Sequence, residues 1–212
     1  MTSKGNLIIN KHITGSCTIQ GGIVHKDAVE LFSNAGTSLP DFLLSIYQHF
    51  AFNYPKFYKM DNLSKLGWLA SEILLKDAGL KEAYEPAGVA VVLANANSSL
   101  DNDLKYVKTI AEIASPSVFV YTLPNIVIGE ICIRNNFKGE HAFFIQEEFD
   151  SEFIYKQVSY LMDQKLASAC ICGWVDVLGN DYKAALYLIE REVTNALAFS
   201  PQNLASVFNS EN

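Results

Sequence analysis

Apolar and polar positions along this chain alternate between helix-like and strand-like stretches. Residues 61–78 carry apolar side chains at a period of 3.6 residues, which predicts a helix. The apolar positions are Leu63, Leu66, Leu69, Ala70, Ile73 and Leu74. Asp61 is expected to cap the start of this helix and Gly79 to end it. A second helix is predicted over residues 39–52.

A strand, turn, helix and strand order follows in the rest of the chain. Residues 89–94 are apolar without alternation, which is typical of a parallel strand covered on both faces. A polar turn over residues 95–99 is expected to cap the next helix rather than line a pocket. The remaining expected elements are helices over 100–113 and 150–164 and strands over 141–145, 167–173 and 184–189. This order predicts an α/β fold with an α-β-α layered sheet.

The first part of the chain is less regular. Residues 8–9 and 13–19 suggest strands, and Gly21 and Gly22 predict a turn after them. No low-complexity linker, internal repeat or charge block interrupts the sequence. With 212 residues, of which 50% are hydrophobic and 18% charged, we expect residues 1–212 to form a single globular domain.

Composition excludes several classes of function. The net charge of −7 and the lack of a Lys/Arg cluster argue against nucleic-acid binding. No apolar run approaches the roughly 20 residues of a membrane helix, and the first residues lack the apolar core of a secretion signal. We therefore expect a cytoplasmic protein. The sequence shows no phosphate-binding glycine loop and no metal-ligand cluster, so neither a cofactor nor a metal is expected.

The four cysteines, Cys17, Cys132, Cys170 and Cys172, have neither zinc-site spacing nor the density of a disulfide scaffold. Cys170 and Cys172 alternate along an expected strand and should share one face. We interpret them as small buried apolar residues in a reducing compartment.

The most informative stretch runs from residue 123 to residue 176. It contains Leu-Pro-Asn at 123–125, Arg-Asn-Asn-Phe-Lys-Gly at 134–139, Gln-Glu-Glu-Phe-Asp-Ser at 146–151 and Ser-Ala-Cys-Ile-Cys-Gly at 168–173. This stretch resembles the N-terminal half of a β-ketoacyl synthase, the condensing enzyme of fatty-acid and polyketide synthesis. In that family a cysteine after the strand takes the acyl chain. Counting from Gly139 without gaps, Glu148 occupies the place of the cysteine.

Three further segments resemble the same family in the same order. They lie at residues 54–80, 88–100 and 184–190, so the resemblance covers roughly residues 54–195, while residues 1–50 match less clearly. It implies one half of the duplicated thiolase-like fold. The second half of the family carries two active-site histidines, in segments that these 212 residues do not contain.

Condensation needs a thiolate at a helix N-terminus and two donors that hold the thioester oxygen. None of these groups stands at a matching place. His141 is the one histidine near the expected reactive point, and it begins the strand, so it should lie at the other end. No catalytic residue is therefore assigned.

Glu148 has two interpretations. A carboxylate at a helix N-terminus could act as a general base or bind a cation. Alternatively, Glu147, Glu148, Asp150 and Glu152 are what the positive end of a helix dipole favours, and we favour this structural interpretation. Gln146 invites comparison with relatives whose cysteine is replaced by glutamine, but it falls two residues too early.

These observations support three hypotheses. The first is a catalytically inactive, truncated ketosynthase-like accessory protein that associates with a complete ketosynthase, an acyl carrier protein or a second copy of itself. The second is an enzyme acting on acyl thioesters, a decarboxylase or acyltransferase, with Glu148 as base, or a subunit that completes a split site. The third is an acyl-chain-binding protein.

The resemblance also implies a homodimer. In full-length relatives the strand before the reactive point pairs across a two-fold axis, and here that strand is residues 141–146. An unpaired strand this apolar would be prone to aggregation. We expect a two-fold dimer through this strand, and a Phe144→Pro substitution should break the dimer or the fold.

Overall fold

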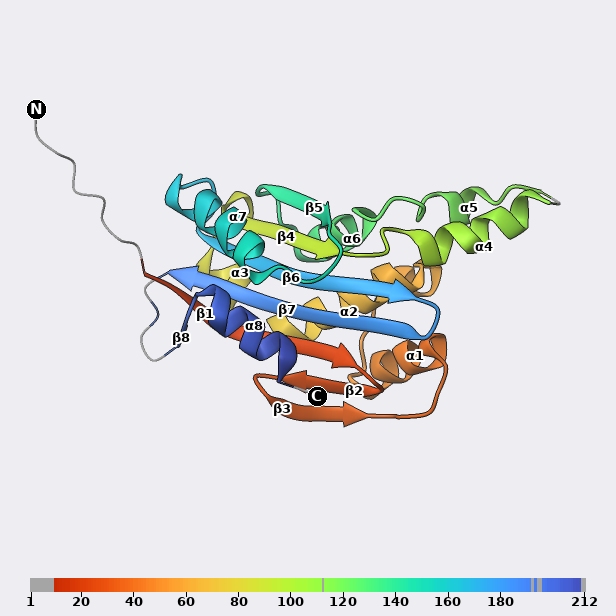
Figure 1. Cartoon of the computed structure of the whole chain (residues 1–212), viewed down its shortest axis with the longest axis horizontal. Helices are drawn as coiled ribbons and strands as arrows, with labels where there is room; N and C mark the ends of the chain where they lie inside the picture. Colours follow the sequence, from red (N-terminus) through yellow and green to blue (C-terminus); the bar gives the residue numbers. More distant parts are fainter. Residues whose placement is uncertain (1–9, 112, 192, 194–195, 211–212) are drawn as a thin grey trace, which may run out of the picture.

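The computed structural model describes residues 10–111, 113–191, 193 and 196–210. One mixed sheet runs through this part of the chain, with the strand order β3-β2-β1-β7-β6-β4-β5 and with β8 paired to β1 (Figure 1). Strand β4 is parallel to β5 and β6, and the other pairs are antiparallel. The strands are β1 Lys11–Gln20, β2 Ile23–Lys26, β3 Val29–Ser33, β4 Val89–Asn95, β5 His141–Ile145, β6 Ala169–Leu178, β7 Asp181–Arg191 and β8 Leu197–Ala198.

Helices cover both faces of this sheet. Side chains of α1, α2 and α6 pack on one face, and side chains of α7 and α8 pack on the other. The prediction of an α-β-α layered fold is confirmed. The helices are α1 Leu39–His49, η1 Pro55–Lys59, α2 Asn62–Leu75, α3 Leu80–Ala83, η2 Pro86–Gly88, α4 Leu100–Ile110, α5 Pro116–Phe119, α6 Ile126–Asn135, α7 Ser151–Asp163 and α8 Pro201–Asn209.

Helix α2 forms for the reasons that its sequence gives, but it ends early. Asp61 Oδ1 accepts a hydrogen bond from the Ser64 amide at 3.0 Å, so Asp61 is the N-cap as predicted. The prediction that Gly79 ends the helix is wrong. The backbone already leaves helical geometry at Lys76, and Asp77 takes a positive φ of 64°. Gly79 instead precedes the short helix α3.

Several other boundaries differ from the sequence pattern. The helix predicted over residues 39–52 ends at His49, and the helix predicted over 100–113 ends at Ile110. Strands β6 and β7 are longer than expected because they form one antiparallel hairpin, paired from Cys170–Ile189 to Leu178–Asp181. Residues 8–9, predicted to be extended, lie outside the described residues.

Gly173, in the middle of β6, tests how tightly this hairpin is packed. Its φ is 141°, and a Cβ atom there would overlap the carbonyl oxygen of Ala185 on β7. Gly173→Ala is therefore expected to lower the free energy of unfolding by about 2–4 kcal/mol. Chemical denaturation measures this, with Gly129→Ala as the control. Gly129 lies in α6 with open space around it, so its alanine variant should be at least as stable as the wild type.

Candidate functional site

The loop of residues 146–150, called the elbow below, joins β5 to α7. It lies where the resemblance implies the reactive cysteine of a ketosynthase. The Gln146 amide donates to the Asn95 carbonyl at 2.9 Å, which fixes the loop to the end of β4. Asp150 is the N-cap of α7, and its Oδ1 accepts from the Phe153 amide at 2.9 Å. The geometry of a strand that turns into a helix is thus present.

Glu148 lies two residues before that N-cap. Its side chain is exposed and makes no hydrogen bond or ion pair with the described part of the chain. Asp150, not Glu148, accepts a hydrogen bond from a backbone amide at the start of α7. Among the described residues, no group of three or more His, Cys, Asp and Glu side chains could hold a metal ion. Glu148 is therefore an exposed carboxylate at the elbow that lies outside the capping bond of α7.

Aromatic side chains fill the space beside the elbow. Phe149 stacks on Phe208 of α8, with ring centroids 4.3 Å apart and planes 16° apart. Trp174 and Tyr187 lie 6.2 and 6.3 Å from the Phe149 ring, and Lys183 donates to the Phe208 carbonyl at 2.7 Å. None of the five main cavities of the described residues is lined by residues 146–151. Helix α8 thus covers the elbow through Phe208.

The histidine and the polar turn nearest the elbow take no part in a site. His141 begins β5, at the strand end away from the elbow, as predicted. In the β4–α4 turn, Asn95 exchanges two hydrogen bonds with Ser98, at 3.0 and 2.8 Å. Asn97 is held by both oxygens of Asp176 on β6, at 3.0 and 2.7 Å. These bonds use the polar groups of the turn within the protein. Ser99 is the N-cap residue of α4, as a helix-capping turn requires, but its side chain makes no capping hydrogen bond to the helix.

The cysteines are poor nucleophiles. Cys170 and Cys172 lie on the same face of β6, as predicted, and both are fully buried. Burial raises the pKa of both thiols, and it raises the pKa of Cys132, in α6, to about 11. Cys17 is also buried. Burial thus disfavours the thiolate form of Cys132, Cys170 and Cys172.

This assignment predicts slow thiol labelling. At pH 8 a thiol with a pKa near 11 is ionised in only about one molecule in a thousand, so Cys132 should react slowly with a disulfide reagent. Cys17, Cys170 and Cys172 should not react until the protein unfolds. Ellman's reagent should give no fast phase in native protein and four thiols in denaturant. One rapidly reacting native thiol would show an activated cysteine.

Strand β5 forms one end of the sheet. It pairs with β4 only, over residues 141–145, and among the described residues nothing pairs with its other side. The Val91 amide donates to the Glu140 carbonyl, and the Gln146 amide donates to the Asn95 carbonyl. The backbone N–H and C=O groups of successive residues in a strand point to opposite neighbouring strands. The backbone groups of even-numbered residues of β5 therefore bond to β4, and those of odd-numbered residues point to the open edge.

Helices α4 and α5 form an arm that extends beyond the end of the sheet (Figure 1). In α4 the large apolar side chains are exposed, and the one buried residue is polar, Asn102. Leu104, Val107 and Ile110 are 53%, 62% and 55% exposed. Further exposed apolar residues along the arm are Leu100, Ile113, Phe119, Val120 and Leu123. The arm therefore exposes several large apolar side chains.

No helix among the described residues is both long and apolar enough to cross a membrane. No family model and no curated protein matches the sequence. Solved structures do share its fold. The ishigamide ketosynthase/chain length factor superposes with a TM-score of 0.61 at 15% identity, over 88% of this chain and 63% of that chain. A β-ketoacyl synthase from Burkholderia phymatum STM815 superposes with a TM-score of 0.58 at 11% identity, over 87% and 60%.

A third match has similar length. A chain of the complex between the ketosynthase ApeO and its chain length factor ApeC, from Xenorhabdus doucetiae, superposes with a TM-score of 0.57 at 12% identity. That match covers 95% of this chain and 91% of the other. By contrast, this chain spans less than two thirds of the first two structures, 63% and 60%. The chain therefore has, over most of its length, the thiolase-like fold of the ketosynthases.

Proposed function

We propose that this chain is a non-catalytic accessory subunit in fatty-acid or polyketide-type biosynthesis, which acts by association with another thiolase-like chain. The observation that carries the proposal is the elbow. It has the strand-to-helix geometry of the fold, but Glu148 stands at the expected position of the nucleophile and aromatic rings fill the space beside it. None of the five main cavities of the described residues reaches the elbow.

The structural neighbours favour this proposal over a free-standing binding protein. Two of them are described as a ketosynthase together with a chain length factor. The ApeO–ApeC match supports a subunit of this size, because it extends over nearly the whole of both chains. These two-chain assemblies favour the proposal that this chain is an accessory subunit of another thiolase-like chain.

Two surfaces of the chain are suited to such a partner. The open side of β5 offers unpaired backbone groups, and Ile145 at its end is 52% exposed. The arm of α4 and α5 offers exposed apolar side chains, and it occupies the same upper side of the molecule as β5 in Figure 1. We propose a homodimer through β5. A heterodimer with a complete ketosynthase through the same surfaces is the alternative outcome.

A charge placed on the arm tests whether it takes part in association. Val107→Glu on α4 should weaken the dimer at least about tenfold, because it places a charge in a desolvated contact. Sedimentation equilibrium measures the change, for the chain alone and mixed with a ketosynthase encoded by a neighbouring gene. Tyr160→Glu, on α7 and 61% exposed, is the matched control and should leave association unchanged. Equal association in both variants would exclude the arm.

The second hypothesis, an enzyme acting on acyl thioesters with Glu148 as base, is supported by one observation. Glu148 is exposed and so is accessible to a bulky carrier-protein substrate. Incubation with malonyl or acyl carrier protein distinguishes it. Hydrolysis or decarboxylation that disappears in Glu148→Gln would favour the enzyme, whereas the accessory role predicts no turnover by either protein.

A further inference from the structure

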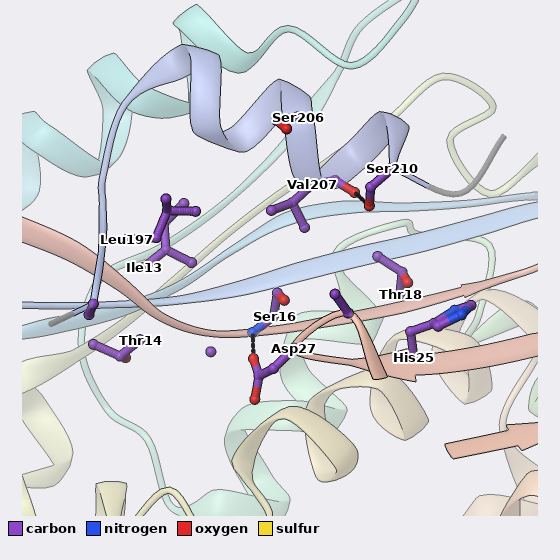
Figure 2. Close-up of a pocket in the computed structure, with 13 residues that line it drawn as sticks. Ile13, Thr14, Ser16, Thr18, His25, Asp27, Leu197, Ser206, Val207 and Ser210 are labelled. Atoms are coloured by element: carbon purple, nitrogen blue, oxygen red, sulfur yellow. Dashed lines mark hydrogen bonds between the residues drawn. The ribbon is translucent and has the colours of Figure 1, made fainter. Parts of the chain in front are cut away.

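A cavity of about 560 Å³ lies apart from the elbow, among β1, β8, the β2–β3 turn and α8 (Figure 2). Small-molecule sites in proteins have volumes of roughly 300–1,000 Å³. The cavity shares no lining residue with the elbow, with β5 or with the arm. A function for it is therefore independent of the association surfaces.

The cavity arises from a gap in the sheet. On one side of β1, strand β8 pairs with His12 and Ile13, and β2 pairs from Cys17 onward. Between these pairs, in the described part of the chain, no strand pairs with residues 14–16 on that side. The register of β1 against β7 also shifts between Ile13 and Gly15. Such bulges are over-represented next to functional sites, and Thr14, the residue at the shift, lines the cavity.

A turn of unfavourable backbone geometry lies next to this gap. Asp27 and Ala28, the two residues between β2 and β3, have positive φ angles of 51° and 64°. Two-residue turns of this kind favour Asn-Gly, so Ala28 is a poor choice for the position. Two bonds hold the turn: the Asp27 amide donates to the Ser16 carbonyl at 3.0 Å, and Asp27 Oδ1 accepts from the Ser16 amide at 2.7 Å. The carboxylate is thereby fixed beside the gap.

The lining combines one negative charge with hydroxyl groups and an apolar wall. Among the described residues that line the cavity, Asp27 is the one carboxylate, none is Lys or Arg, and His25 is the one other titratable side chain. Its Oδ2 accepts no hydrogen bond from the described residues. The Ser16 hydroxyl, in a residue only 9% exposed, likewise has no partner among them. The side chains of Ile13, Leu197 and Val207 form the apolar part of the lining.

We propose that this cavity binds a small primary amine that carries a short apolar chain. The ammonium group donates a hydrogen bond to Asp27 Oδ2, and the apolar chain packs on Val207 and Leu197 under α8. A charge-assisted hydrogen bond to a fixed carboxylate is stronger than a neutral one, so the site selects cations over neutral or anionic molecules of the same shape. Helix α8 closes the cavity on one side with Ser206 and Val207 (Figure 2).

Isothermal titration calorimetry with hexylamine, hexanol and hexanoate tests the proposal, because these probes share a chain and differ only in the head group. The wild type is expected to bind hexylamine saturably, and at least about tenfold more tightly than hexanoate, with hexanol between them. Asp27→Asn keeps an oxygen that can accept from the Ser16 amide but removes the charge. It should abolish the preference for the amine over the alcohol.

Variants at Ser206 locate the binding. Ser206 is exposed on α8, so Ser206→Phe should fold normally by circular dichroism, fill the cavity and remove binding of all three probes. Ser206→Ala leaves the cavity open and should bind as the wild type does, and Glu148→Gln removes a distant carboxylate and should have no effect. The proposal is overturned if hexylamine gives no saturable heat up to about 10 mM, if hexanoate binds as tightly, or if Ser206→Phe binds like Ser206→Ala.

Discussion

Incubation of the chain with malonyl or acyl thioesters is expected to leave its intact mass unchanged and to yield no condensation product. The elbow carries the exposed Glu148 where the resemblance implies a thiolate, and a carboxylate is a poor acyl carrier because the anhydride it forms is itself very reactive. The buried thiols cannot substitute, since burial raises the pKa of Cys132, Cys170 and Cys172. Intact-mass spectrometry after incubation measures the outcome.

Glu148→Cys makes this expectation sharper. The variant supplies a thiol at the elbow, but these 212 residues lack the two histidine segments that the resemblance implies for decarboxylation. We expect an acyl adduct at most, and no condensation. Condensation by Glu148→Cys alone, or an adduct on Glu148 or on a cysteine of the wild type with turnover, would contradict the non-catalytic assignment.

The layers of the fold were predictable because burial on both faces leaves a clear pattern. The seven residues of β4 are all buried, and the apolar face of α7 packs Ile154, Val158 and Met162 against the sheet, as its 3.6-residue period predicts. Helix ends were less predictable. Gly79 looks like a helix stop, yet Asp77 adopts positive φ before the chain reaches it. Local propensity does not decide between two residues so close in sequence that can both take that geometry.

The resemblance located the elbow, and Asp150 or Ser151 was the expected cap of α7; the structure has Asp150. The covering of the elbow by Phe208 of α8 was not predictable from the sequence. Phe149 and Phe208 are 59 positions apart in the printed sequence, and no periodicity links the residues of α8 to the loop they cover. The same holds for the cavity between β1 and α8, which depends on β8 and β2 pairing with different parts of β1. Contacts between segments distant in sequence leave no local signal.

Proline substitutions in β5 are expected to separate the dimer from the fold. Phe144 is an even-numbered residue, so its amide bonds to β4 within the same chain, and Phe144→Pro removes a bond of the internal ladder. The sequence alone predicted that this variant loses the dimer or the fold. The structure predicts that it loses the fold. Ile145 faces the open edge, and proline is tolerated where the lost amide is not part of the ladder. Ile145→Pro should therefore remain folded and become monomeric.

Multi-angle light scattering with circular dichroism measures both properties on the same samples. Wild type is expected to elute as a dimer at micromolar concentration, Ile145→Pro as a folded monomer, and Phe144→Pro as unfolded or aggregated protein. Because Ile145 is 52% exposed, its replacement costs little core packing, so a loss of dimer cannot be attributed to a collapsed core. Ile145→Val, which keeps the amide, is the matched control and should stay dimeric. If the wild type is monomeric by itself but pairs with a ketosynthase, and Ile145→Pro abolishes that pairing, the β5 edge is the interface of a heterodimer. If the wild type is a dimer and Ile145→Pro does not change it, the β5 edge is excluded as the interface.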